Sequence, residues 1–189
     1  MSGDDAGGKE GSDTGDGAVR RDGTGGTYTL LVELAAPAAI EVGALGGHRF
    51  EPGGYAYTGS ALGTGGFSRV DRHRRTARGE HDVRHWHVDH LLGHPDARID
   101  EVVRSVGADV ECAVAGRLPA GPVDGFGASD CDCGSHLAAA DDGEALDEFA
   151  ARVREAHEDA VAGTDAAVDA VAGSADGVDR DANGASATR

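Results

Sequence analysis

The sequence predicts a single α+β domain in which a small mixed or antiparallel β-sheet is flanked by helices. Three observations lead to this class. Short runs of β-branched and aromatic residues come early, stretches with helical periodicity follow them, and both ends are rich in glycine, alanine and aspartate. The 189 residues are enough for one domain with a hydrophobic core and tails.

Strands are expected where β-branched and aromatic residues gather between turn residues. Four segments meet this description: residues 27–34, 39–45, 50–58 and 99–106. Gly53 and Gly54 weaken the third segment and indicate a bulge or a close approach of another backbone.

Helices are expected where apolar residues recur every three or four positions. Three segments are predicted as helices: residues 67–78, 85–92 and 143–162. The short apolar run 110–118 fits either a strand or a helix. A glycine-rich loop over 125–135, which carries two cysteines, separates this run from the last helix.

These elements divide the chain into four parts. We expect a disordered N-terminal tail over 1–25, a core domain over 26–140, a C-terminal amphipathic helix over 141–162 and a disordered acidic tail over 163–189. The tails contain few large apolar side chains, so they cannot bury enough surface to offset the entropy lost on ordering.

The charge pattern points to a saline environment. The formal charge is −17, and Lys9 is the one lysine among 17 basic residues. This composition is typical of halophilic proteins in a high-salt cytoplasm, where salt screens the repulsion between acidic groups. An ordinary acidic protein is the alternative. The acidity therefore does not argue against a nucleic-acid partner.

Three further features of the sequence bear on the cellular compartment of the protein. No apolar run approaches the roughly 20 residues that span a bilayer, and the N-terminus lacks a signal-peptide pattern. Three cysteines are an odd number, which argues against a disulfide framework. We expect a soluble cytoplasmic protein with no membrane partner, and the sequence does not indicate its oligomeric state.

One segment concentrates groups suited to phosphodiester chemistry. The run GGYAYTGS at residues 53–60 is preceded by Gly-Thr-Tyr at residues 26–28 and followed by Arg69. Tyr57 can hold or accept a proton, glycine lets a backbone approach a phosphate, and Arg69 can neutralise that phosphate. Tyrosines in strands often only pack, and we expect Tyr55 to do so on the face opposite Tyr57.

The order Gly-x-Tyr, Tyr-x-Gly, Arg resembles the GIY-YIG nuclease superfamily. A longer set of motifs is similar to the DUF123 family, which is related to those nucleases. The motifs are GYAYTGSALG at 54–63, Arg72-His73, HWHVDHLL at 85–92, Glu111-Cys112 and GFGASDCDCGSHL at 125–137. They span about residues 26–138 and imply a GIY-YIG-like fold for the core.

The resemblance implies a role in DNA hydrolysis for each matching residue. Tyr57 would act as general base or position the attacking water, and Tyr28 would help to orient it. Arg69 would bind the scissile phosphate, and Glu111 would ligate a divalent cation, Mg²⁺ or Mn²⁺. His73 would orient a tyrosine or share the phosphate. The residues expected to contact substrate are Gly59, Ser60, Arg72, Arg75 and His87.

The chain departs from the superfamily pattern in two places. The gap between Tyr28 and Tyr57 is longer than the superfamily usually shows. An asparagine that tends to follow the metal-binding glutamate is absent, and Ser129 or Asp130 stands at about that distance. Asp130 would either hold a hydrogen bond or supply a second metal ligand.

A second constellation has the residue types of a zinc site. Cys131, Cys133 and His136 lie close together in the sequence, and His85, His87 or His90 could supply a fourth ligand for Zn²⁺. The alternatives are reduced cysteines and hydrogen-bonded histidines that close a loop, or catalytic thiol chemistry. We expect Cys112, in an apolar run, to be a small core residue.

Three functions remain open. The leading one is a metal-dependent endonuclease that acts on DNA, in DNA repair. The second is a non-catalytic module that binds nucleic acid through Arg69, Arg72 and Arg75, although an arginine-rich helix is often only a solvated face. The third is a zinc-stabilised interaction protein. The first is favoured if Tyr57, Arg69 and Glu111 surround one pocket.

Overall fold

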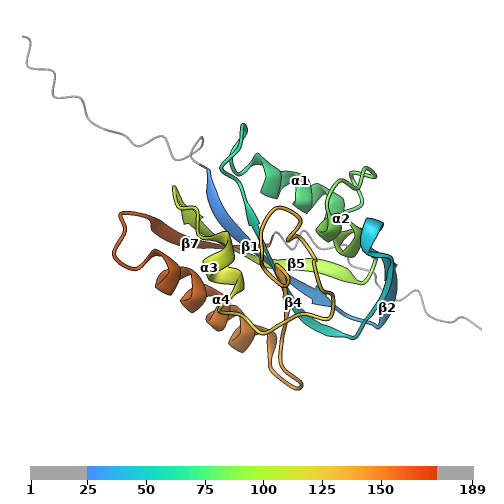
Figure 1. Cartoon of the computed structure of the whole chain (residues 1–189). Helices are drawn as coiled ribbons and strands as arrows, with labels where there is room; N and C mark the ends of the chain where they lie inside the picture. Colours follow the sequence, from blue (N-terminus) through green and yellow to red (C-terminus); the bar gives the residue numbers. More distant parts are fainter. Residues whose placement is uncertain (1–24, 174–189) are drawn as a thin grey trace, which may run out of the picture.

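The computed structural model describes residues 25–173, and an antiparallel β-sheet lies at its centre (Figure 1). Five strands form this sheet in the order β6-β4-β1-β5-β7, and all of their pairings are antiparallel. Their bounds are Gly26–Leu34 for β1, Gly53–Ser60 for β4, Ala97–Val106 for β5, Leu137–Ala139 for β6 and Ala167–Ala172 for β7. The predicted α+β class is therefore confirmed.

A two-stranded ribbon accompanies the main sheet. It consists of β2 (Ala38–Glu41) and β3 (Gly47–Phe50), joined through a 3-10 turn, η1 (Gly43–Leu45). The predicted strand 39–45 therefore ends early, and the predicted strand 50–58 is divided between β3 and β4. Pro52 lies at this division, where a residue without a backbone N–H cannot donate to a ladder.

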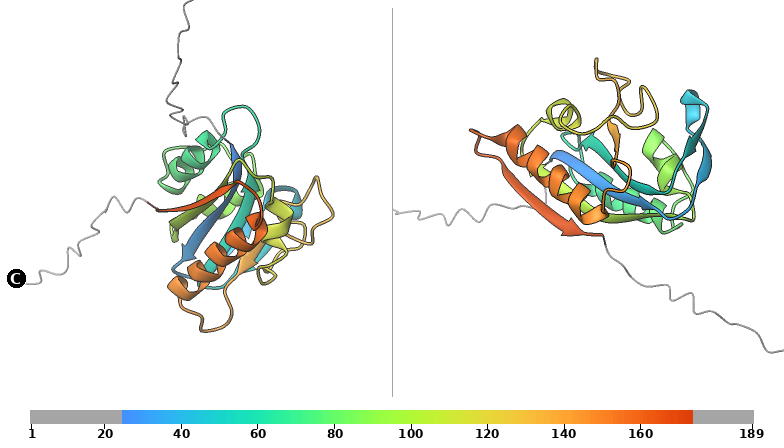
Figure 2. Two further views of the ribbon diagram at one scale, coloured as in Figure 1. Left: turned by 90° about the vertical axis from the view of Figure 1, so that its left-hand side faces the viewer. Right: turned by 90° about the horizontal axis from the view of Figure 1, so that it is seen from below.

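Helices cover both faces of the sheet (Figure 2). Their bounds are Ser68–Ala77 for α1, His87–Leu92 for α2, Glu111–Ala115 for α3 and Leu146–Val161 for α4. Residues of α1 and α2 share a core cluster with Leu30 and Val32, whereas residues of α4 share another with Leu31. This alternation along β1 follows from the period of two in a strand. The run 110–118, left open by its pattern, contains α3.

The same period corrects the prediction for Tyr55. Residues two apart in a strand point to the same face, so Tyr55 and Tyr57 both belong to the core cluster on the α1 side. Tyr55 packs edge-on against Phe50 at a centroid distance of 5.6 Å, and its hydroxyl donates to the carbonyl oxygen of Glu51 at 2.6 Å. It does pack as expected, but the expectation of an opposite face was wrong.

The segment after α4 also differs from its prediction. Residues 167–172 form β7, which pairs with β5 at the edge of the sheet, within the part of the chain predicted as a disordered tail. The guanidinium of Arg104 donates to both carboxylate oxygens of Asp169 at 2.7 Å across this pair. Strand pairing thus orders a short run of small side chains, Ala-Val-Asp-Ala-Val-Ala, that its sequence pattern does not mark as a strand. Residues 1–24 and 174–189, which hold the remaining tail predictions, lie outside the described residues.

A buried polar network lies between the sheet and α4. The two ring nitrogens of His157 lie 2.7 Å from the hydroxyls of Thr29 and Ser105, and the Thr29 hydroxyl lies 2.9 Å from that of Thr58. All four side chains are buried. Burial lowers the pKa of His157 to about 4, so the ring is neutral at neutral pH.

The helices of the described part are short or polar. None of those between residues 25 and 173 combines the length and the apolar content that crossing a membrane requires.

Candidate active site and metal cluster

A polar pocket of about 210 Å³ lies where β4 meets α1, α2, α3 and the loop 125–135. Its lining residues are Tyr57, Ser60, Arg69, His85, Trp86, His87, Glu111, Gly127, Ser129 and Asp130. Tyr57, Arg69 and Glu111 therefore surround one cavity. Ser60 and His87, two of the predicted substrate contacts, also line it. So do Ser129 and Asp130, which stand at about the distance expected for the superfamily asparagine.

The ring of Tyr57 is held between two glycines. A Cβ atom on Gly59 would lie 3.1 Å from its Cε1, and one on Gly127 would lie 2.7 Å from its Cε2. Phe126 packs edge-on against the ring at a centroid distance of 5.9 Å. Burial raises the pKa of Tyr57, and the Glu111 carboxylate raises it further. The hydroxyl therefore stays protonated at neutral pH and can donate a hydrogen bond.

Tyr28 packs against Tyr57 and is oriented by a buried histidine. The Tyr28 hydroxyl lies 2.9 Å from Nε2 of His73, and Nδ1 of His73 lies 2.9 Å from Oδ1 of Asp89. Because Nδ1–H donates to the carboxylate, Nε2 accepts the hydroxyl proton of Tyr28. Burial lowers the pKa of His73, against the effect of the Asp89 hydrogen bond. Of its two predicted roles, this geometry favours the orientation of a tyrosine.

Asp89 anchors this network, a role that the sequence pattern did not reveal. Its carboxylate accepts hydrogen bonds from both terminal nitrogens of Arg72 at 3.0 and 3.1 Å, and from the backbone N–H groups of His85 and Trp86. Burial alone would raise the pKa of Asp89, but the hydrogen bonds from His73 and Arg72 hold it well below its usual range. Arg72 is thus paired with Asp89 and lies outside the pocket lining.

Arg69 reaches the pocket from α1 across an aromatic side chain. Its guanidinium carbon is 4.9 Å from the ring centre of Trp86, and Nη1 donates to the carbonyl oxygen of Ser60 at 2.8 Å. The guanidinium of Arg72 stacks on the same ring at 3.7 Å, so Trp86 positions both arginines. Arg75 is exposed and does not line the pocket.

His87 ties the loop 125–135 to α2. Its Nδ1 accepts the backbone N–H of Gly127 at 3.0 Å, and its ring packs edge-on against Phe126 at 5.5 Å. Burial lowers the pKa of His87, and His90 lowers it further. The neutral ring therefore carries its proton on Nε2. His90 lines a different cavity, of about 430 Å³, so these two histidines do not face the same space.

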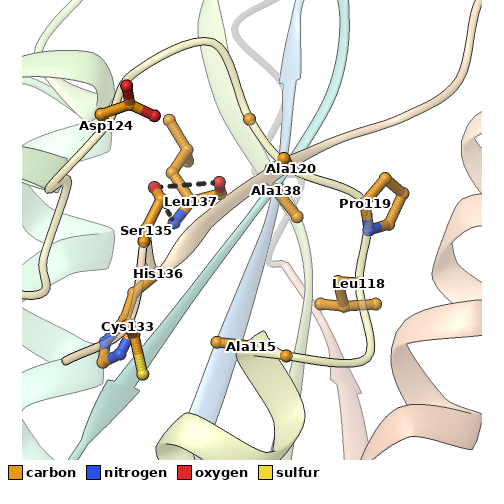
Figure 3. Close-up of a pocket in the computed structure, with 13 residues that line it drawn as sticks. Ala115, Leu118, Pro119, Ala120, Asp124, Cys133, Ser135, His136, Leu137 and Ala138 are labelled. Carbon is orange, nitrogen blue, oxygen red and sulfur yellow. Dashed lines mark hydrogen bonds between the residues drawn. The ribbon is translucent and has the colours of Figure 1, made fainter.

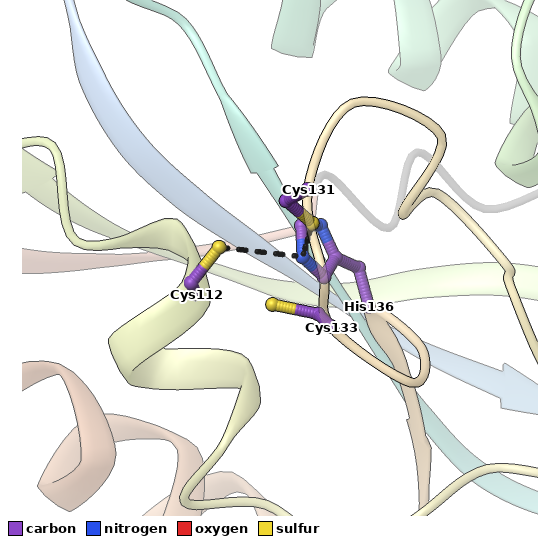
Figure 4. Close-up of side chains that lie close together, drawn as sticks. All are labelled: Cys112, Cys131, Cys133 and His136. Carbon is purple, nitrogen blue, oxygen red and sulfur yellow. Dashed lines mark hydrogen bonds between the residues drawn. The ribbon is translucent and has the colours of Figure 1, made fainter.

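Four side chains of types that can bind a metal lie close together (Figure 4). They are Cys112 from α3 and Cys131, Cys133 and His136 from the segment before β6, and their ligand atoms all lie within 4.8 Å of one another. Nε2 of His136 is 3.3 Å from Sγ of Cys131 and 3.9 Å from Sγ of Cys112. Three sulfurs and one imidazole nitrogen are a donor set that can hold a metal ion.

The fourth member of this cluster corrects the sequence prediction. Cys112 is exposed at the start of α3 rather than part of the core, and it takes the place expected for His85, His87 or His90. The sequence contains a signal for Cys112 as the fourth ligand. Cys112 is the one cysteine outside the Cys-x-Cys pair, and with that pair and His136 it makes a set of four ligands.

Glu111 connects the pocket with the cluster. Its Oε1 accepts a hydrogen bond from Nδ1 of His136 at 2.9 Å, and its carboxylate also lines the pocket. This hydrogen bond raises the pKa of His136. Since Nδ1 carries the donated proton, Nε2 is the nitrogen that faces the thiols.

Another cavity, of about 270 Å³, lies next to the cluster and has Cys133 and His136 in its wall (Figure 3). Residues of the segment 115–120 provide a largely apolar side. Ser135 donates to the carbonyl oxygen of Leu137 at 3.2 Å and accepts the Leu137 N–H at 3.1 Å. Neither arginine nor tyrosine lines this cavity, so it is less suited to a phosphate than the Tyr57 pocket.

Fold and site together define a small α+β domain with a tyrosine, arginine and glutamate pocket beside a thiol-rich cluster. The family model described as "Domain of unknown function DUF123" matches residues 27–160, and the chain belongs to this family. The predicted family is therefore confirmed. Comparisons with curated proteins and with solved structures find no match.

Proposed function

We propose that this protein is a GIY-YIG-like, metal-dependent endonuclease that hydrolyses phosphodiester bonds in DNA during DNA repair. The observation that carries the proposal is the convergence of Tyr57, Arg69 and Glu111 on one pocket, although they come from a strand and two helices far apart in the sequence. A proton donor, a cation and a carboxylate around one cavity are the groups that phosphodiester hydrolysis requires.

Arg69 is the phosphate-binding group of this proposal. One of its terminal nitrogens bonds to the Ser60 carbonyl, and a guanidinium has five N–H donors in a planar fork, so others remain for a phosphate. Trp86 fixes the orientation of the group, which lowers the entropy lost when substrate binds.

Tyr57 serves as a positioning donor in this proposal. Its raised pKa disfavours the phenolate that a general base would need, whereas the protonated hydroxyl can hold the attacking water or a phosphate oxygen. Tyr28 supports it from the adjacent strand, with its own hydroxyl turned toward His73.

Glu111 and Asp130 would hold the hydrolytic cation. Both carboxylates line the pocket, and Mg²⁺ or Mn²⁺ is commonly held by one or two carboxylates together with waters and substrate phosphates. Such a cation would neutralise charge on the phosphate and assist the leaving oxygen. Glu111 uses one oxygen for His136, so its second oxygen is the one available to the ion. The sulfur-rich cluster favours Zn²⁺ instead, which assigns the two kinds of ion to different sites.

A nicking assay on supercoiled plasmid tests this proposal. The full chain, in KCl-rich buffer, should nick DNA when Mg²⁺ or Mn²⁺ is added and not when it is omitted. Omission is preferable to a chelator, which would also strip a zinc site. Tyr57→Phe, Glu111→Gln and Arg69→Ala should each lose about 100-fold or more in rate. Plain, nicked, branched and uracil-containing substrates identify the preferred DNA.

Tyr55→Phe is the matched control, because Tyr55 lies on the same face of β4 but outside the pocket lining. It should retain wild-type nicking. Equal nicking by Tyr57→Phe and the wild type would overturn the assignment. KCl must be varied in each assay, since salt weakens phosphate contacts that depend on counterion release.

A non-catalytic nucleic-acid-binding module is the second candidate. The observation that favours it is Trp86, which lines the pocket next to Arg69 and offers a ring on which a base could stack. DNA retention without metal-dependent nicking, weakened by Arg69→Ala, would support this function over hydrolysis.

A further inference from the structure

We infer that Cys112, Cys131, Cys133 and His136 form a structural Zn²⁺ site that fixes Glu111 through the imidazole of His136. The metal site itself stands independently of the hydrolytic activity, whereas the purpose of fixing Glu111 rests on the proposed function. The four ligands come from two segments, α3 and the loop before β6, so a bound ion would cross-link them.

The distances are close to those of a tetrahedral zinc site. Zn–S bonds of about 2.3 Å and Zn–N bonds of about 2.0 Å place neighbouring ligand atoms roughly 3.5–3.8 Å apart. The ligand atoms of the cluster already lie within 4.8 Å of one another, and the Cys131 and His136 atoms are 3.3 Å apart. Small side-chain rotations therefore suffice to close the coordination sphere.

The second nitrogen of His136 is engaged as zinc-binding histidines usually require. Metal-bound imidazoles almost always donate their other N–H to a carboxylate, a carbonyl or a water, which fixes the tautomer and the ring orientation. Nδ1 of His136 donates to Glu111, and the side chains are 2% and 21% exposed respectively. The ring is thus buried and aligned, with its free lone pair toward the sulfurs.

The loop that carries the ligands contains little regular secondary structure. Between α3 and β6 the described structure contains no helix or named strand, and one isolated bridge joins Ala120 to Ala138. The loop closes through the hydrogen bond from the Gly125 N–H to the Gly134 carbonyl, at 2.7 Å. It also provides three of the pocket residues, Gly127, Ser129 and Asp130. A metal cross-link would supply the folding free energy that regular structure does not.

A disulfide is the competing use of the same thiols. It would join two cysteines, and it would leave the third thiol and the lone pair of His136 without a bond. Thiol titration of the unfolded, chelator-treated protein distinguishes the two: three free thiols support the zinc site, and one free thiol overturns it.

Elemental analysis of tag-free protein tests the ligand set. The wild type should contain about one zinc per chain, and Cys112→Ser, Cys131→Ser and His136→Asn should lose it. His85→Asn and His90→Asn are matched controls that should keep it. Zinc-free wild type, or a Cys112→Ser variant that retains full zinc, would overturn the inference.

Replacement of the ion with Co²⁺ tests the site in the wild-type protein, without any variant that could fail to fold. The expected result is intense thiolate-to-cobalt absorption in the near ultraviolet together with the visible bands of tetrahedral Co²⁺. The absence of thiolate absorption would show that the sulfurs are not ligands and would overturn the site.

The coupling to Glu111 has its own test. Competition with a chromophoric chelator should show that Glu111→Gln weakens zinc affinity about 10- to 100-fold, the usual effect of losing such a partner. Asp130→Asn is the control, because Asp130 lines the same pocket but is not bonded to His136, and it should leave the affinity unchanged. Unchanged affinity in Glu111→Gln, or equal weakening in Asp130→Asn, would refute the coupling.

These readouts fail separately from the nicking assay. Stoichiometric zinc with Glu111-dependent affinity but no nicking would remove only the proposed hydrolysis. Metal-dependent nicking by a protein that never binds zinc would remove only this inference.

Discussion

Acid should destabilise this protein through one buried histidine. His157 lies on the buried face of α4, and its two ring nitrogens are bonded to the hydroxyls of Thr29 and Ser105 in the sheet. Burial lowers its pKa to about 4, whereas the histidine of an unfolded chain titrates at about 6.5. The protonated ring would have to lose either the hydrogen bond it accepts or its buried position.

The size of the effect follows from these two pKa values. Between about pH 6.5 and pH 4 the unfolded chain binds a proton that the folded protein does not, so the free energy of unfolding falls as the pH drops and levels off below about 4. The difference of about 2.5 between the two pKa values, at about 1.4 kcal/mol for each tenfold change, corresponds to about 3.5 kcal/mol in full, of which about 3 kcal/mol is lost by pH 4, where the folded protein is itself half protonated. This is a large part of the roughly 5–15 kcal/mol that stabilises a typical domain.

Urea unfolding at constant KCl across this pH range tests the prediction. The substitution His157→Gln keeps an amide donor and acceptor for the two hydroxyls but removes the titration. Wild type should lose about 3 kcal/mol more than this variant between neutral pH and pH 4. Other titrating groups are present in both proteins, so their contributions cancel in the difference.

The exposed histidine His85 provides the control. His85→Gln should retain the wild-type loss of stability in acid. If wild type and His157→Gln show the same pH dependence, the reasoning from burial is refuted.

The remaining predictions concern the packing of the site. Gly59→Ala would place a Cβ 2.7 Å from the hydroxyl of Tyr28 and should cost roughly 1–3 kcal/mol in urea unfolding, whereas Gly63→Ala, with nothing within 4 Å, should cost less than 0.5 kcal/mol or so. A similar loss in both would contradict the close contact. Asp89→Asn leaves its histidine and arginine partners without a buried carboxylate and should lower stability by about 3–5 kcal/mol, measured by thermal unfolding. Asp71→Asn, which removes an exposed pair with Arg74 within α1, should change it little, and a comparable loss there would argue against the buried network.

Several features of the fold could be predicted because they depend on neighbouring residues. The β-branched run before Pro37 became β1, and the amphipathic pattern over 143–162 became α4. The alternation of side chains along a strand also places Tyr55 on the same face as Tyr57. That face could have been assigned without a structure.

Other features depend on partners distant in the chain. The segment 167–172 is a strand because β5 offers an unpaired edge, and its run of alanines and valines with one aspartate carries no comparable signal. Asp89 resembles an ordinary helical carboxylate in the sequence, and only the packing of α2 against α1 buries it beside His73 and Arg72.

Local motifs and composition are enough to predict the family, the α+β class and the residue types suited to phosphate and metal chemistry. How those residues are divided between two sites depends on the folded arrangement of the chain. This arrangement brings Tyr57, Arg69 and Glu111 around one pocket, makes Cys112 the fourth member of the thiol cluster, and joins the two sites through His136. The physical reason is that a ligand set or a pocket is defined by distances between side chains, which chain folding alone establishes.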